Sequence, residues 1–431
     1  MTTPERVSFD SGQTKPHRPR SAVGMRAGWG LADQMVSSLT NAGLSIMIAR
    51  AVDADSFGAF GVAFAVFSFT LGASRAIVSD PLVIRYSSAD AGALRAAVSR
   101  ATGLVLVFGA AVGAAVFAAS TALGGTVAVS LRALALVLPG LLLQDSWRYA
   151  FLARGRPRAA LVNDLVWGVT QFALIGLLVT ARAQTVSLLV LAWGGAGLAG
   201  AAFGLAQAKV LPRPGRALAW LREHRDLAPL LVLEYTITLG VFNAALFMIG
   251  VLSGLSDVGA IRAAQVLLGP IQVLFLGAAA ITVPEFSRRT DRNSAVLTRD
   301  AAVVSGVLAC AATAWLLVLL LLPDSVGIAV LGDSWPGARR TLPYVGLMLI
   351  SIGSNAGPYL MLRALGAGRR VLQASALQAP LTLVFGVTGA VVASAPGAAA
   401  GFAVAHWFGT GLWWISLRIQ LRIHSGDSTP S

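Results

Sequence analysis

The sequence has little charge and almost no cysteine. Only 12% of its 431 residues are charged and 56% are hydrophobic, whereas roughly 25% of the residues in an average soluble domain are charged. This composition excludes a water-soluble globule and indicates a polytopic membrane protein. The single cysteine, Cys310, lies in an apolar run, which excludes an intramolecular disulfide and a metal–thiolate cluster.

Catalytic and nucleotide-binding motifs are also missing. The sequence has no phosphate-binding glycine loop, no HExxH, no GxSxG and no CxxC pair. We therefore expect a protein that is not an enzyme, holds no cofactor or metal, and is driven by the membrane potential, an ion gradient or removal of a product. Residues 1–25 are polar and basic with no short apolar core behind them, so no cleaved signal peptide is expected.

Long apolar runs dominate what is present. A helix needs about 20 residues to cross a hydrocarbon layer of ~30 Å. Runs of this kind lie near residues 28–50, 57–83, 101–123, 129–152, 160–181, 185–208, 229–252, 258–284, 301–323, 341–365, 371–394 and 397–419. They predict an all-α membrane protein of about twelve transmembrane helices.

The positive charge is unevenly distributed among the loops. The net charge is +14, and most of the 33 cationic residues lie in the two tails and in alternate loops. The intervening loops hold only Arg50, Arg132, Arg182, Arg339 and Arg340. Because cytoplasmic loops carry the excess of Lys and Arg, both termini are predicted to be cytoplasmic. The Arg-, Ala- and Gly-rich composition is typical of GC-rich bacterial genomes, so we expect the bacterial cytoplasmic membrane as the location and no nucleic-acid partner.

The longest connection divides the spans into six and six. It is basic, contains prolines and is amphipathic, as a linker on the inner membrane surface would be. The predicted organisation is a cytoplasmic basic tail (1–27), an N-terminal six-helix bundle (28–208), a cytoplasmic amphipathic linker (209–228), a C-terminal six-helix bundle (229–419) and a cytoplasmic tail (420–431).

The two halves repeat each other. SFGAFGVAFA from Ser56 aligns with DVGAIRAAQV from Asp257, and DPLVIR from Asp80 matches VPEFSR from Val283. Since six spans is an even number, the two copies have the same orientation and are related by an axis along the membrane normal. Two such pseudo-symmetric bundles around a central cavity are typical of transporters that work by alternating access.

A stretch near the N-terminus carries a resemblance. The segment ADQMVSSLTNAGLSIMIARAVDADSFGAFGVAFAVFSF, from Ala32, has an Asn in span one, an I-A-R ending, a short acidic loop and an F-G-x-F opening of span two. In these features it resembles the polysaccharide and lipid-linked oligosaccharide flippases, of the O-antigen or teichoic-acid exporter type, in the multidrug/oligosaccharidyl-lipid/polysaccharide exporter superfamily. The resemblance covers two spans directly and the other ten through topology, length and repeat. It implies a twelve-helix, two-lobed exporter of a polyprenyl-(pyro)phosphate-linked glycan.

Two arginines lie inside predicted spans. In span two, Arg75 shares a stripe of small and polar residues, and in span eight Arg262 shares one with Gln265 and Gln272. Guanidinium groups grip phosphate oxygens with paired hydrogen bonds, and the resemblance implies arginines on these two spans as diphosphate contacts. We therefore predict Arg75, Arg262, Gln265 and Gln272 as cavity residues that bind the substrate. The alternative for Arg75 is neutralisation of a buried acid such as Asp33.

Three other polar residues are candidates for ion coupling. Asp33 and Asn41 lie on one broad face of span one, and Glu234 lies near the start of span seven. A desolvated carboxylate near cations can titrate or bind Na⁺, although each acid could instead reach the nearby inner interface. Glu234 and Asn243 would face the same side only if span seven bends near Gly240.

Further residues have a structural and a functional interpretation. Asp145 and Arg148 are three residues apart and are expected to pair with each other, and His406 is expected to be a packing residue. A shared face of span five, with Asp164, Trp167 and Gln171, fits either packing or a wall on which sugars stack. Pro81 and Pro284 occupy equivalent repeat positions and are hinge candidates.

The combined prediction is a flippase that translocates a polyprenyl-(pyro)phosphate-linked glycan precursor to the outer leaflet for surface polysaccharide biosynthesis. Its partners would be the lipid-linked glycan, membrane lipid and, as further candidates, glycan-assembly enzymes. The first alternative is a cation-coupled multidrug exporter of the same superfamily. A membrane glycan polymerase or ligase is disfavoured because the predicted outer loops are short, and a scaffold is disfavoured by the intramembrane charge stripes.

Overall fold

The structure is a computed structural model that describes residues 20–289 and 292–426. Every regular element within these two ranges is a helix. Ten of the described helices are long and apolar enough to cross a membrane, counting continuous stacks of short helices as one. The all-α fold predicted from the apolar runs is confirmed.

The first half of the chain forms a bundle of long helices. They are α1 (Arg20–Ala51), α2 (Ala54–Ser74), a π-helical segment (Arg75–Ser79), α3 (Asp80–Tyr86), α4 (Ala91–Ser120), α5 (Gly125–Ala153), α6 (Pro157–Thr180) and α7 (Val186–Ala208). Together α2, the π-helical segment and α3 make one apolar span. We call this part the N-terminal bundle.

The second half begins after two short helices. A 3-10 turn (Pro214–Arg216) and α8 (Ala217–Glu223) lead to α9 (Ala228–Tyr235), a π-helical segment (Thr236–Gly240), α10 (Val241–Leu252), α11 (Leu255–Leu267), α12 (Gly269–Ser287), α13 (Ser294–Leu320), α14 (Asp324–Leu331), a 3-10 turn (Gly332–Ser334), α15 (Trp335–Ala364) and α16 (Gly368–Gly426). We call the helices from α9 onward the C-terminal bundle.

The helical geometry departs from a regular α-helix at four places in the described chain. The expected eighth span, 258–284, is made of α11 and α12, which meet at Leu268. The two π-helical segments lie in spans two and seven, and the second one falls where a bend near Gly240 was expected. In α16, non-helical backbone at Ala393 and Ser394 separates the expected spans eleven and twelve.

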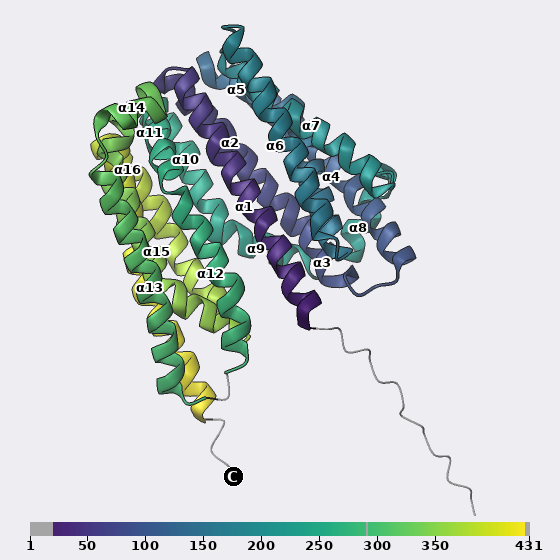
Figure 1. Cartoon of the computed structure of the whole chain (residues 1–431), viewed down its shortest axis with the longest axis vertical. Coiled ribbons are helices and arrows are strands. Elements are labelled where there is room, and N and C mark those ends of the chain that lie inside the picture. Colours follow the sequence, from purple (N-terminus) through teal and green to yellow (C-terminus); the bar gives the residue numbers. More distant parts are fainter. Residues whose placement is uncertain (1–19, 290–291, 427–431) are drawn as a thin grey trace, which may run out of the picture.

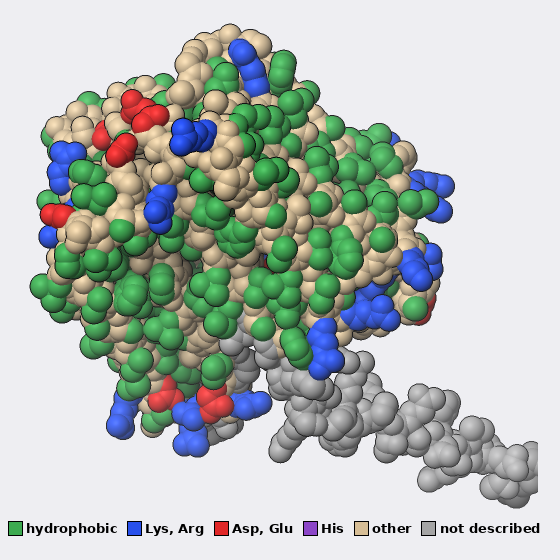
Figure 2. Space-filling view, turned by 45° about the horizontal axis from the view of Figure 1, so that its top comes forward, with side chains coloured by type: hydrophobic (Ala, Val, Ile, Leu, Met, Phe, Trp, Pro, Cys, Tyr) green, Lys and Arg blue, Asp and Glu red, His purple; other side chains and the backbone are tan. Residues whose placement is uncertain are grey.

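The two bundles meet at one end of the molecule and diverge toward the other (Figure 1). They approach each other where α2 and α11 cross, and they spread toward the end where α1 begins and the C-terminus lies (Figure 1). On the face seen in Figure 2, hydrophobic and uncharged side chains cover the middle, and most charged side chains gather toward the edges. This distribution fits a protein whose waist lies in hydrocarbon.

Glycines allow the close crossing of α2 and α11. A Cβ atom on Gly58 would lie 1.8 Å from the carbonyl oxygen of Leu255, and a Cβ on Gly259 would lie 2.9 Å from that of Ala54. In the sequence repeat, Ala54 and Gly58 align with Leu255 and Gly259, so the same contact is made twice in reciprocal form. The crossing therefore follows the pseudo-two-fold relation predicted from the repeat.

The two equivalent helices begin differently. Asp53 caps α2, because its carboxylate accepts hydrogen bonds at 2.9 Å from the backbone N–H and from the hydroxyl of Ser56. The bond from the Ser56 backbone N–H is the main cause of the lowered pKa of Asp53. The equivalent cap of α11 is Gly254, which has no side chain to accept such a bond.

The connection between the bundles is docked on the N-terminal bundle. The indole N–H of Trp220 donates to the carbonyl of Ile77 at 3.2 Å, and Trp220 is fully buried. Arg85 forms an ion pair with Asp226, and Arg100 lies 2.5 Å from a carboxylate oxygen of Glu223. These contacts fix the start of α9, and with it span seven, relative to spans two and three.

Candidate functional site

A large cavity lies between the two bundles. Its volume is about 1710 Å³, and its walls come from α1, α2, α3, α9–α12, α15 and α16, with a few residues from α5 and α13. Its closed end is lined by Arg262 and Phe64, which lie about one to two turns beyond the glycines at the crossing of α2 and α11. Its other end is lined by Ile84, Glu234 and Arg363, and Ile84 is 59% exposed. The cavity therefore opens on the side where α1 begins and the chain ends.

Arg262 lies at the closed end of the cavity and has no acidic partner among the described residues. No carboxylate of the described residues lies within 4 Å of its guanidinium, and its Nε is buried without a hydrogen-bond partner. Its Cζ lies 3.7 Å from the centroid of the Phe64 ring, across the boundary between the bundles. Phe64 is in turn stacked on Trp193 at 5.7 Å. The aromatic pair holds the guanidinium at the cavity surface through a cation–π contact.

Several of the predicted site residues line the same cavity. Gln265 and Gln272 do so from α11 and α12, Asn41 from α1, and Glu234 from α9. Glu234 lies at the mouth, 3.7 Å from Arg363 of α15. Asn243 also lines the cavity, because the π-helical segment between it and Glu234 changes their relative direction. Their roles in substrate binding and ion coupling remain predictions.

Arg75 is engaged by a carboxylate. Its Nε and one terminal nitrogen donate to the two oxygens of Asp145 at 2.9 and 2.6 Å, which makes a bidentate pair between the π-helical segment of span two and α5. The guanidinium also lies 5.2 Å from the ring centroid of Tyr149, and Tyr149 lines the cavity. Arg75 is thus one residue behind the cavity surface. To contact a phosphate it would have to exchange Asp145 for the ligand.

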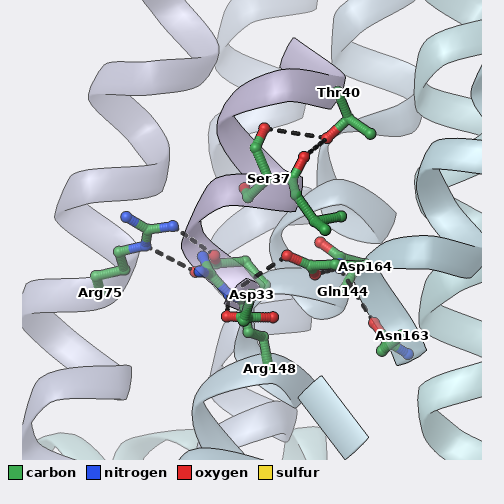
Figure 3. A network of polar contacts seen from close by, with 10 residues as sticks. Asp33, Ser37, Thr40, Arg75, Gln144, Arg148, Asn163 and Asp164 are labelled. Atoms are coloured by element: carbon green, nitrogen blue, oxygen red, sulfur yellow. Dashed lines mark hydrogen bonds and ion pairs between the residues drawn. The ribbon is translucent and has the colours of Figure 1, made fainter. Parts of the chain in front are cut away.

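Asp33 lies in a buried network inside the N-terminal bundle (Figure 3). Arg148 Nε donates to Asp33 at 2.6 Å and lies 3.4 Å from Asp164, and the Asp33 side chain is 1% exposed. The expected pair of Asp145 with Arg148 is wrong. The helix α5 directs these side chains toward different neighbours, so Asp145 binds Arg75 and Arg148 binds the acids of α1 and α6.

The shared face of span five does not line the cavity, and one of its residues, Asp164, belongs to the network of Asp33 and Arg148. Gln144 donates to Asn163 at 3.1 Å and to Asp164 at 2.8 Å, as Figure 3 shows. Gln171 donates to the carbonyl of Thr40 at 3.1 Å. These bonds lie at the contact of α6 with α5 and α1 and satisfy the amide groups of Gln144 and Gln171. Of the two interpretations offered for this face, packing is the one that the contacts support.

The hinge candidates occupy different settings. Pro81 lies in the first turn of α3, directly after the π-helical segment of span two. Pro284 lies within α12, whose helix continues to Ser287, and the interruption of span eight is at Leu268. The side chain of Pro284 lies outside the described residues. As hinges, both prolines remain predictions.

One wall of the cavity was missed by the sequence analysis. Six residues of α15 and α16 line it, and we call this set the amide–aromatic wall: Asn355, Tyr359, Ser375, Gln378, His406 and Trp413. They come from three different spans, so no single helical stripe contains them. The available signal was the concentration of amides and aromatics in otherwise apolar spans. His406, expected to be a packing residue, is part of this wall.

The comparisons with known proteins rest on structure. No known protein family matches the sequence, and no curated protein sequence is similar to it. A multidrug resistance MATE family transporter of the MOP superfamily, in an inward-facing conformation, superposes with a TM-score of 0.72 at 12% identity, over 93% of this chain and 100% of that one. An outward-facing conformation of such a transporter gives 0.64 at 13% identity, over 96% and 97%.

A lipid II flippase is also similar. MurJ in an inward closed conformation superposes with a TM-score of 0.67 at 10% identity, over 93% of this chain and 92% of that one. At such identities the likeness establishes the fold. This chain therefore has the all-α, twelve-helix, two-bundle membrane fold shared by these MOP superfamily transporters and the lipid II flippase.

Proposed function

We propose that this chain is a flippase that moves a polyprenyl-(pyro)phosphate-linked glycan precursor from the cytoplasmic to the outer leaflet of the bacterial cytoplasmic membrane. The observation that carries the proposal is Arg262. It is a guanidinium in a large intramembrane cavity, with no carboxylate of the described residues within 4 Å. By contrast, Arg75 and Arg148 are both paired with buried acids.

The physical argument concerns the cost of a charge in the membrane. A charged side chain at mid-membrane costs about 2.5–3.5 kcal/mol on insertion scales, and a sequence retains it where it has a partner, water or a function. Arg262 lines the cavity and has no acidic partner among the described residues, so an anion in the cavity can supply its counter-charge. A phosphate offers pairs of oxygens that a guanidinium binds with two parallel hydrogen bonds. Gln265 and Gln272 add uncharged donors on the same side of the cavity.

The size and shape of the cavity support a large amphipathic substrate. Its volume of about 1710 Å³ exceeds the range of roughly 300–1,000 Å³ common for small-molecule pockets. A head group of several sugars fits such a space while its prenyl chain stays in the lipid between the bundles. The lining is mostly apolar with scattered polar groups.

The mouth of the cavity gives the direction. Since both termini are predicted to be cytoplasmic, the cavity faces the cytoplasm in this conformation. The head group would enter there, and the bundles would rock about the crossing of α2 and α11 to open the other side. A membrane potential positive outside favours outward movement of an anion by ~2.3 kcal/mol per charge per 100 mV. In this cycle Asn41 and Glu234, which line the cavity, are proposed coupling residues. Asp33 is a further proposed coupling residue, and to bind an ion it would have to exchange Arg148 for that ion. Pro81 and Pro284 are the proposed hinges.

A cation-coupled multidrug exporter is the second candidate. Two carboxylates, Asp80 and Glu234, line the cavity together with many apolar side chains, and this combination suits an apolar cation. The MATE transporter with which the chain superposes is described as a multidrug resistance protein.

The test separates the two functions in the native bacterium. A strain lacking this chain is complemented with the wild type, with Arg262→Gln or with Arg340→Gln, a control in which an exposed arginine of α15 is changed in the same way. We expect the deletion to lose surface glycan, and Arg340→Gln but not Arg262→Gln to restore it at equal protein level. A deletion with normal surface glycan and reduced tolerance to cationic drugs would favour the exporter.

A further inference from the structure

The amide–aromatic wall differs in its chemistry from the rest of the cavity. Its six residues, defined above, are all uncharged side chains or a histidine, and they come from spans ten, eleven and twelve. We propose that this wall is a subsite for a polyhydroxylated group, that is, for the sugar part of the substrate. The proposal rests on the proposed function and adds to it where the sugar binds.

The amide groups of the wall are oriented by the protein. The indole N–H of Trp413 donates to Oε1 of Gln378 at 3.1 Å. One lone pair of the oxygen is therefore used, and the bond fixes which end of the amide is the oxygen. The NH₂ of Gln378, whose side chain is half-buried at the cavity, is left as a donor for a ligand. Asn355 and Ser375 are recessed into the same surface. Such groups match sugar hydroxyls, which both donate and accept hydrogen bonds.

His406 adds an acceptor of fixed direction. Its Nδ1 lies 2.9 Å from the carbonyl oxygen of Phe402. A carbonyl can only accept a hydrogen bond, so the proton of the neutral ring is on Nδ1 and Nε2 carries the free lone pair. His406 lines the cavity, so this lone pair is available to a ligand hydroxyl there.

The aromatic members supply an apolar face beside these polar groups. The rings of Tyr359 and Trp413 make an edge-to-face pair with centroids 5.4 Å apart and an interplanar angle of 86°. Trp413 is 6% exposed and packs behind Tyr359, whose partly exposed ring is the one that a ligand in the cavity can contact. A sugar ring has an apolar C–H face and a rim of hydroxyls, so it fits an aromatic surface bordered by amides.

The charge distribution favours a neutral group over a cation at this wall. Among the described residues of α15 and α16 that line the cavity, Arg363 is the one charged side chain. It lies 3.7 Å from Glu234, and its Cζ lies 5.4 Å from the ring centroid of Tyr359, at the edge of the wall. No carboxylate of the wall is present to neutralise a cation. An anionic group would instead find Arg262 on α11. One ligand with phosphate and sugar therefore has a separate place for each part.

The experiment measures binding of two short-chain probes to the full-length protein in lipid nanodiscs by calorimetry. The probes are citronellyl diphosphate and citronellyl diphosphate linked to N-acetylglucosamine. The variants are Gln378→Leu and Asn355→Leu in the wall, Arg262→Gln at the closed end of the cavity, and Thr388→Val as a control. Thr388 is exposed on α16 and its hydroxyl bonds only within its own helix.

We expect the wall variants to weaken binding of the sugar-bearing probe by about fivefold to tenfold, as the loss of a hydrogen bond would. Binding of the sugar-free probe should stay unchanged. Arg262→Gln should weaken both probes, and Thr388→Val neither. The subsite is refuted if both wall variants bind the two probes as the wild type does, or weaken both equally. No binding of either probe to the wild type would contradict the proposed function itself.

Discussion

The two bundles share one architecture but differ in whether their intramembrane arginines are paired with carboxylates. In the N-terminal bundle, Arg75 is paired with Asp145, and Arg148 lies between Asp33 and Asp164. In the C-terminal bundle, Arg262 faces the cavity without a carboxylate of the described residues within 4 Å, and the opposite wall carries amides and aromatics. The first arrangement fixes a rigid bundle, and the second leaves charge and hydrogen-bonding groups available to a ligand.

The difference shows how function can be located in a repeat protein. A buried ion pair is already satisfied, and losing one partner leaves an uncompensated charge. An unpaired charge at a cavity is satisfied by water and can be satisfied by a ligand. Arg75, predicted from its stripe as a ligand contact, belongs to the first class in this conformation, and Arg262 belongs to the second.

The largest expected effect comes from making the same substitution in each bundle. Arg148→Gln leaves Asp33 and Asp164 without their cation and should destabilise the protein by about 3 kcal/mol. Arg262→Gln removes no ion pair and should change stability little. Chemical denaturation of the two variants in detergent measures this contrast. Equal loss of stability in both would remove the distinction between a structural and an available arginine.

The crossing of α2 and α11 gives the next effect. A Cβ on Gly58 cannot fit against the carbonyl of Leu255, so Gly58→Ala should destabilise the closed crossing by about 2 kcal/mol. The reagent accessibility of a cysteine at Ala54, in a Cys310→Ser background, should rise. Gly306→Ala is the control, because nothing lies within 4 Å of its Cβ position. Unchanged labelling of the cysteine in Gly58→Ala would mean that the crossing of α2 and α11 does not close this end of the cavity.

The pair of Arg75 and Asp145 should show a smaller coupling. The two side chains are 31% and 10% exposed, so water screens the pair in part. A double-mutant cycle with Arg75→Gln and Asp145→Asn should give a coupling free energy of about 1–2 kcal/mol in denaturation measurements. Additive single effects would show that the bidentate contact contributes nothing to stability.

The smallest effect concerns the caps of the equivalent helices. Asp53→Ala should cost about 0.5–1 kcal/mol at neutral pH, because α2 loses its cap. The pKa of Asp53 is lowered by its hydrogen bond from Ser56, so this stability is present above the unfolded pKa of about 3.9 and is lost as pH falls through the folded pKa. The stability difference between wild type and variant should therefore narrow in acid. A difference independent of pH would exclude the carboxylate as the cap.

Part of this structure could be predicted from the sequence because it depends on local patterns. The length of each apolar run predicts a span. Arg262, Gln265 and Gln272 are close together in the sequence, so the consecutive helices α11 and α12 bring all three to the cavity. The partners of Arg148 were not predictable, because Asp33 and Asp164 come from other helices. The amide–aromatic wall was missed for the same reason. Its six residues come from three spans and lie side by side only because α15 packs against α16.

The most direct test is flipping by the purified chain in lipid vesicles, with undecaprenyl diphosphate linked to N-acetylglucosamine as the probe. The account predicts that the wild type moves the probe and that Arg262→Gln lowers the rate at least about tenfold. Arg262→Lys should be intermediate, because an ammonium keeps the charge but loses the bidentate contact. An Arg262→Gln variant that flips the probe at the wild-type rate would contradict the account.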